Sequence, residues 1–179
     1  MLVRRAGNRA VVFAFVWFAS FPFAHRGTAA VTNGGDLPST GPQFSSYPAR
    51  ANFRGTPAHV RLDDAQARRF RTRLREDSRQ GPNFAGHYTV VFWGCGSGCA
   101  GMAVVDAYTG RVTWLPLDWI DIPDEQDVKP NRNYRLDSRL LVVTRSHYDA
   151  SASFTAYYYL IEKGRFRLIR KLEGNHSDG

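Results

Sequence analysis

The two cysteines of the chain, Cys95 and Cys99, enclose a short Gly-Ser-Gly loop between two stretches of alternating character. Those stretches, Phe84 to Cys95 and Cys99 to Tyr108, are rich in Val, Tyr, Phe, Trp and Thr, which is typical of β-strands. A loop this short joins only antiparallel neighbours and places the flanking residues opposite each other. Opposed residues lie within the range that a disulfide accepts. The sequence therefore predicts a hairpin closed at its tip by a structural Cys95–Cys99 disulfide.

The cysteine pair has two alternative interpretations, a redox-active bond and metal or other thiol chemistry. The spacing is one residue longer than the C-x-x-C redox motif. Zinc sites usually show a second pair of Cys or His, and none accompanies this pair in the sequence. We therefore predict neither a metal site nor a cofactor. Because a bridge over so short a loop removes little unfolded-state entropy, we expect it to hold the loop's shape.

The hairpin register predicts which residues share a face. It places Trp93 opposite Gly101, where the missing side chain leaves room for the indole ring. One set of side chains is expected to form the core: Val90, Phe92, Met102 and Val104. The other face carries His87, Thr89 and Trp93. We expect a helix to cover that face through Phe70 and Leu74, because sheets often bury both faces. The alternative is an uncovered shelf that binds a ligand.

One helix is predicted before the hairpin. Asp63 or Asp64 is a suitable N-cap, since a short carboxylate accepts bonds from the free amides of the first turn. The following residues, 65–78, place Ala67, Phe70 and Leu74 on one stripe. Gly81-Pro82 ends the helix.

Further strands follow the hairpin. The stretches with strand character are 111–115, 139–145, 154–162 and 165–172, and a short edge strand is weakly indicated at 57–62. The connectors Tyr108-Thr109-Gly110 and Lys163-Gly164 carry the glycine that tight hairpins need. The predicted fold class is mainly β with minor α: an antiparallel meander of about six strands with one N-terminal amphipathic helix.

The first thirty residues are typical of a secretory signal. Three arginines precede an apolar run of about 15 residues, Ala10 to Ala24, and small residues end at Ala30. We expect cleavage after Ala30, with Ala24 as the alternative. A membrane-spanning helix needs about 20 apolar residues, so no stable membrane span is expected after cleavage. An uncleaved N-terminal anchor is the alternative. The predicted location is periplasmic or secreted, which favours disulfide formation.

The signal sets the domain boundaries and changes the charge balance. The predicted organisation is a signal peptide at 1–30, a flexible Gly/Pro/Ser-rich linker at 31–52, a single β-rich domain at 53–173 and a tail at 174–179. Four of the 24 basic residues lie in the signal, so the remainder carries 20 basic against 16 acidic residues. The net charge of +4, together with the expected location, argues against a nucleic-acid partner.

Three sequence blocks resemble those of a group of small exported bacterial proteins. The blocks begin at Asn83 (NFAGHY), at Trp93 (WGCGSGC) and at Val105 (VDAYTG), and residues 134–141 (YRLDSRLL) are similar to a downstream strand of that group. The shared pattern is N-F-x-G-H-Y, then W-G-C-G-x-x-C, then D-x-x-T-G. The resemblance covers roughly Phe53 to Leu172 and implies one secreted domain without implying a reaction.

Several polar residues are candidates for function. His87 is suited to general-base or ligand-binding roles because imidazole titrates near neutral pH. Asp106 lies one pair away but on the opposite face of the predicted hairpin, so a His87–Asp106 dyad needs a bulge. Ser97 lacks the strand-turn-helix context of a nucleophile elbow. Five acidic residues between Asp118 and Asp127 lack the calcium-loop spacing and are expected to form a solvated loop. The arginine-rich helix is expected to present a solvated face; the alternatives are a face that binds an anionic surface or ligand, or one that packs against the acidic loop.

The predicted function is that of an exported, non-catalytic binding module of the bacterial cell envelope. Its binding candidates are His87, Tyr88, Trp93 and Asp106, and its partner is an envelope protein or a small ligand. One alternative is an envelope enzyme that uses His87 with Asp106, or a redox-active Cys95/Cys99 pair. The other alternative is a purely structural envelope component, which would show neither a pocket nor a sizeable exposed apolar patch.

Overall fold

The computed structural model describes residues 40–50, 52–96, 98–121, 133–147 and 153–175. The chain divides into two units, Met1–Val31 and Thr32–Gly179, and the described residues all belong to the second. The predicted signal peptide, the first part of the predicted linker and the end of the predicted tail therefore lie outside the described residues.

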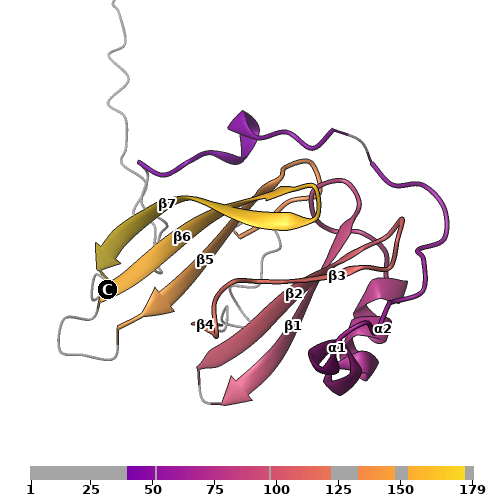
Figure 1. The fold of residues 1–179 in the computed structure, drawn as a ribbon. Coiled ribbons are helices and arrows are strands. Elements are labelled where there is room, and N and C mark those ends of the chain that lie inside the picture. The colour runs from indigo at the N-terminus through magenta and orange to yellow at the C-terminus, as the bar shows by residue number, and fades with distance from the viewer. Residues whose placement is uncertain (1–39, 51, 97, 122–132, 148–152, 176–179) are drawn as a thin grey trace, which may run out of the picture. The chain divides into compact units, whose positions relative to one another are not determined.

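The described residues form two antiparallel sheets (Figure 1). The first sheet contains β1 (Tyr88–Gly96), β2 (Cys99–Asp106) and β3 (Val112–Trp114), and the short β4 (Ile120–Asp121) pairs with β2. The second sheet contains β5 (Leu140–Ser146), β6 (Ser153–Glu162) and β7 (Arg165–Asn175). The mainly β fold is confirmed. A single meander of about six strands is not confirmed, because the described residues hold seven strands in two sheets.

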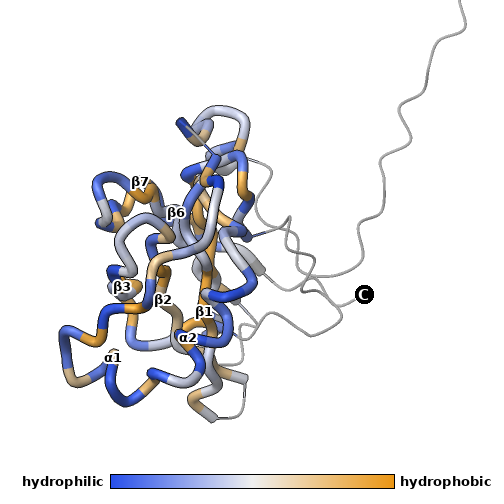
Figure 2. Tube along the Cα trace, turned by 90° about the vertical axis from the view of Figure 1, so that its right-hand side faces the viewer, coloured by the Kyte–Doolittle hydropathy of each residue, from blue (hydrophilic) through white to orange (hydrophobic). Residues whose placement is uncertain are grey.

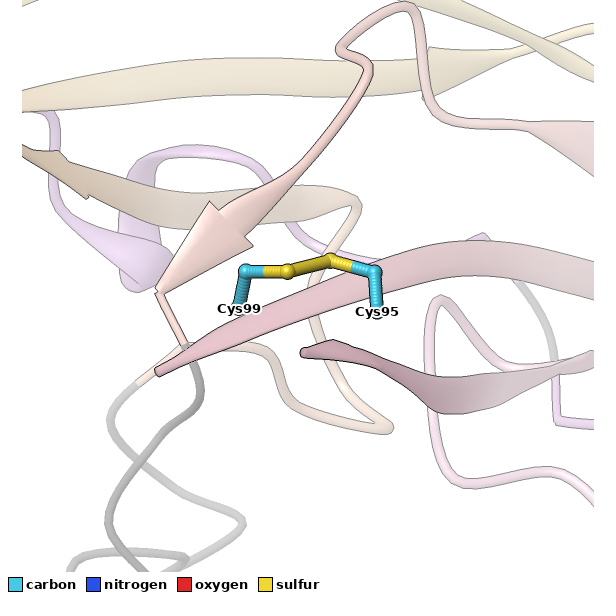
Figure 3. Close-up of a disulfide and its surroundings, with 2 residues drawn as sticks. All are labelled: Cys95 and Cys99. Atoms are coloured by element: carbon cyan, nitrogen blue, oxygen red, sulfur yellow. A yellow bond between two sulfur atoms is a disulfide. The ribbon is translucent and has the colours of Figure 1, made fainter. Parts of the chain in front are cut away.

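The register of the first hairpin agrees with the prediction along most of its length. Trp93 lies opposite Gly101, and Tyr88 lies opposite Asp106. The register shifts at the tip, where Gly94 pairs with Ala100 but Gly96 pairs with Cys99. Cys95 is therefore the extra residue of a bulge. The prediction that Cys95 lies directly opposite Cys99 is wrong. The two cysteines are nevertheless 5.4 Å apart at Cα and form a disulfide (Figure 3).

Two short helices replace the single helix predicted at 65–78. They are α1 (Ala65–Arg69) and α2 (Arg71–Arg79), and Phe70 between them has φ −97° and ψ 16°. Asp64 is the N-cap of α1, and its carboxylate accepts a bond from the amide of Ala67. The indole Nε1 of Trp114 donates to the same carboxylate, and these two bonds lower the pKa of Asp64. This N-cap therefore ties the start of the helices to β3.

Three clusters of buried side chains hold the elements together. The largest lies between the sheets and joins Val90, Met102 and Val104 of the first to Leu141, Val143 and Tyr159 of the second. A second cluster packs Ala67 and Leu74 of the helices against Val91, Ala103 and Val105. The predicted core face is thus confirmed, and the helices cover the opposite face at Val91 and Trp93, whereas His87 does not belong to this cluster. Figure 2 shows hydrophobic segments along the strands, whereas α1 is largely hydrophilic.

The third cluster lies on the outer face of the second sheet and involves the N-terminal segment. Phe44, in the 3-10 helix η1 (Phe44–Ser46), and Tyr47 pack against buried residues such as Tyr158. The hydroxyl of Ser138 donates to the carbonyls of Phe44 and Tyr47 at 2.8 and 3.0 Å. Packing against the sheet therefore begins before Phe53, within the described part of the predicted linker.

Residues 57–62 run beside the turn between β2 and β3 without forming a strand, so the weakly indicated edge strand is absent there. The amide of Ala58 donates to the carbonyl of Ala107, and that of Arg61 donates to the carbonyl of Gly110. Gly110 has φ +68°, and a Cβ built on it would meet the carbonyl of His59. Glycine is therefore needed there both for the turn and for the close approach of this segment.

Candidate functional site

A cleft of about 990 Å³ lies where three parts of the second unit meet. Most of its lining comes from the residues just before and at the start of β1, the turn between β2 and β3, and the hairpin between β6 and β7, and Arg50 and Arg139 complete it. The hydroxyl of Thr113 donates to the carbonyl of Gly164 at 3.0 Å, which ties β3 to the β6–β7 turn. The turn itself is tight, since Lys163 and Gly164 both have positive φ, as the Lys-Gly sequence predicted.

Two of the four predicted binding residues, His87 and Tyr88, line this cleft. The His87 ring lies 4.2 Å from the ring of Tyr88 and 5.2 Å from that of Tyr108, measured between centroids. Tyr108 is 55% exposed, and Phe53 packs edge-on against it at 4.9 Å. The cleft therefore has an aromatic wall whose outermost ring is open to solvent.

Tyr88 is the buried member of this wall. Burial raises the pKa of its hydroxyl, and the negative charge of Asp106 raises that pKa further, while a backbone hydrogen bond from Gly164 lowers it. The net shift is upward, so the hydroxyl stays protonated at neutral pH and is available as a hydrogen-bond donor.

Basic side chains dominate the charge of the cleft. Within the described part of the chain, the lining includes six cations and one carboxylate: Arg50, Arg111, Arg139, Lys163, Arg165, Arg167 and Glu162. Glu162 lies 3.2 Å from Arg139 Nη1 and 3.0 Å from Arg167 Nε. The hydrogen bond from Arg167 and the charges of both arginines lower the pKa of Glu162. Glu162 therefore stays ionised and neutralises part of the charge of these two arginines.

Asp106 lies next to the cleft but does not line it. Its carboxylate accepts a hydrogen bond from the amide of Tyr108 at 2.8 Å, which stabilises the β2–β3 turn. No hydrogen bond or ion pair joins Asp106 to His87 among the residues that the structure describes. The two residues are thus close in the hairpin without forming an acid–base dyad.

Trp93 lies on the helix-covered face of the first sheet, opposite to Tyr88, and does not line the cleft. Its indole stacks on Phe70 at 4.4 Å between centroids, and Gly101 lies directly beneath it. The Cys95–Cys99 disulfide lies at the opposite end of the β1–β2 hairpin from the cleft. The structure therefore brings two of the four binding candidates together and separates both Trp93 and the cysteines from them.

Sequence reasoning missed Tyr108 and all six cations of the cleft. Arg165 and Arg167 follow the Lys163-Gly164 turn at a spacing of two, which places them on one face of a strand. Arg111 follows the glycine of the other turn. Basic residues next to two glycine turns were thus a visible signal, but nothing in the sequence showed that the two turns lie side by side.

The acidic stretch predicted as a solvated loop is only partly described. Asp121 accepts bonds from the amide and the hydroxyl of Ser146, and residues 122–132 lie outside the described residues. None of the helices in the described ranges is both long and apolar enough to cross a membrane.

Comparison with known proteins adds no assignment. No protein family, curated protein or solved structure matches this chain. The resemblance to small exported bacterial proteins therefore stays an expectation.

Proposed function

We propose that this chain is an exported, non-catalytic binding module of the bacterial cell envelope, and that the cleft is its binding site. The observation that carries the proposal is an open cleft of ligand size with an exposed aromatic ring, Tyr108, beside a cluster of cations. Ligand sites combine such apolar walls with a few well-placed polar groups. The disulfide and the signal-like leader support an oxidising location outside the cytoplasm.

The alternatives have less support. A purely structural component is expected to lack a pocket, whereas the structure contains this cleft. An enzyme that uses His87 with Asp106 needs the carboxylate to orient the imidazole, whereas the Asp106 carboxylate binds the amide of Tyr108. A redox function of Cys95 and Cys99 would be located at the other end of the hairpin, away from the cleft.

The experiment that tests the proposal begins with the full chain expressed in a Gram-negative bacterium. Mass spectrometry of the protein from the periplasmic fraction should give an N-terminus at Val31, or at His25 if the signal is cleaved after Ala24. A cytoplasmic protein that keeps Met1 would contradict export.

The purified processed protein is then used to capture ligands from envelope extract, alongside two variants. Tyr108→Ala removes the exposed ring of the cleft, and Leu168→Ala removes an exposed apolar side chain that does not line it. We expect one ligand to be retained by the wild type and by Leu168→Ala, and retention by Tyr108→Ala to fall by about tenfold. Equal retention by all three proteins would rule out the cleft as the binding site.

A further inference from the structure

Four cations of the cleft have no acidic partner among the residues that the structure describes. Within the described ranges, no ion pair involves the following side chains: Arg50, Arg111, Lys163 and Arg165. All four are exposed, whereas Arg139 and Arg167 are held by Glu162. Like charges gathered on a concave surface repel one another and create a positive potential there. An anion bound among them would relieve that repulsion.

The chemistry of these cations indicates which class of anion binds among them. Three of the four are arginines, whose planar guanidinium groups match the oxygen geometry of carboxylate and phosphate. A single carboxylate carries one negative charge. A phosphate monoester carries about −1.5 to −2 at pH 7 and three acceptor oxygens, which suits a cleft lined by several cations better. The charge of the cleft therefore favours phosphate.

The aromatic wall indicates the chemistry of the rest of the ligand. The exposed ring of Tyr108 lies beside His87, and Ala85 and Ile161 add apolar surface to the lining. The C–H face of a sugar ring can pack on Tyr108 while one of its hydroxyl oxygens accepts a bond from the protonated hydroxyl of Tyr88. Inorganic phosphate would leave this wall uncovered.

We propose that the cleft binds the phosphate monoester of a small, ring-bearing molecule such as a sugar phosphate. This inference rests on the proposed binding function and names its ligand class. The phosphate lies toward Arg111, Lys163 and Arg165, and the ring lies on Tyr108 beside His87. Glu162 forms ion pairs with Arg139 and Arg167 and neutralises part of their charge. The anion is therefore attracted more strongly to the cations at the β2–β3 and β6–β7 turns.

Isothermal calorimetry on the processed protein tests the ligand class with four compounds. Glucose 6-phosphate contains both the ring and the dianion, inorganic phosphate lacks the ring, glucose lacks the anion, and glucuronate carries one carboxylate. We expect glucose 6-phosphate to bind at least about tenfold more tightly than each of the other three compounds. Its affinity should fall with added salt. Equal affinity for inorganic phosphate would overturn the role of the ring, and equal affinity for glucose or glucuronate would overturn the role of the phosphate.

Two variants on β7 test the position of the phosphate. Arg165→Ala removes a cation of the cleft, and Arg170→Ala removes an exposed arginine of the same strand that does not line the cleft. Affinity for glucose 6-phosphate should fall about tenfold or more in Arg165→Ala and stay unchanged in Arg170→Ala. Equal losses in both variants would mean a nonspecific charge effect and would overturn the proposal. If no phosphate binds while Tyr108→Ala still loses its envelope ligand, the ligand class is wrong and the binding function stands.

Discussion

Trp93 and Gly101 show how a single residue pair sets the packing on one side of the first sheet. A Cβ built on Gly101 would clash with the Cε2 and Nε1 atoms of the indole. The indole in turn stacks on Phe70, the residue between the two helices. Glycine at position 101 therefore leaves room for the indole of Trp93, and the helices pack against the sheet through this ring.

At the residue scale, we predict that Gly101→Ala destabilises the domain by about 1–3 kcal/mol, because the added methyl group displaces the indole. Urea unfolding followed by tryptophan fluorescence measures the change. Gly94→Ala on β1 is the control, since its added Cβ meets nothing within 4 Å. Its effect should stay within about 0.5 kcal/mol. Similar effects of the two substitutions would show that strand propensity, rather than the indole contact, decides stability.

The β1–β2 hairpin illustrates how turn chemistry and a crosslink act together at the scale of an element. Gly96 and Gly98 have φ values of +138° and +73°, which other residues rarely adopt. The bulge at Cys95 lets the hairpin close and still leaves the two cysteines within bonding range. The crosslink therefore joins residues that the strand pairing already holds close together.

We predict that the double variant Cys95→Ser/Cys99→Ser loses about 2 kcal/mol of stability or less, because a loop this short removes little unfolded-state entropy. Thermal unfolding of the variant, and of the wild type with and without reductant, measures the loss. Alkylation of the native wild-type protein should label neither cysteine unless reductant is present. Labelling without reductant would contradict the disulfide, and a much larger loss would assign the bond a main role in stability.

At the scale of the whole second unit, stability depends on the core that the two sheets share. Leu141 of β5 is fully buried in this core, together with Val90 and Val104 of the first sheet. Neither sheet buries its inner face without the other. The described domain is therefore expected to unfold in one cooperative transition.

Leu141→Ala tests this expectation, because the substitution lies in the second sheet while Trp93 and Trp114 report on the first. We predict a loss of about 2–5 kcal/mol, with coincident transitions by tryptophan fluorescence and far-ultraviolet circular dichroism. Leu168→Ala, at a position that is 41% exposed, should change stability by about 0.5 kcal/mol or less. A wild-type fluorescence midpoint in Leu141→Ala would mean that the sheets unfold independently.

The sequence by itself determined those features that depend on near neighbours. The short loop between Cys95 and Cys99 predicted the register of Trp93 opposite Gly101. An aspartate before the apolar stripe, Asp63 or Asp64, was predicted as the N-cap, and the glycines marked both turns. These features rest on short-range sterics and hydrogen bonding, which a few adjacent residues specify. His87 was a candidate because imidazole titrates near neutral pH, and Tyr88 follows it in the predicted strand.

Only the tertiary structure decided how the strands divide into sheets and which side chains form the cleft. Arg111 and Arg165 belong to turns more than fifty positions apart in the sequence, and no periodicity indicates that these turns meet. Their proximity follows from the packing of two apolar sheet faces against each other, a non-directional interaction that leaves no local pattern. The cleft therefore arises because burying the shared core brings two basic turns beside the aromatic residues at the start of β1.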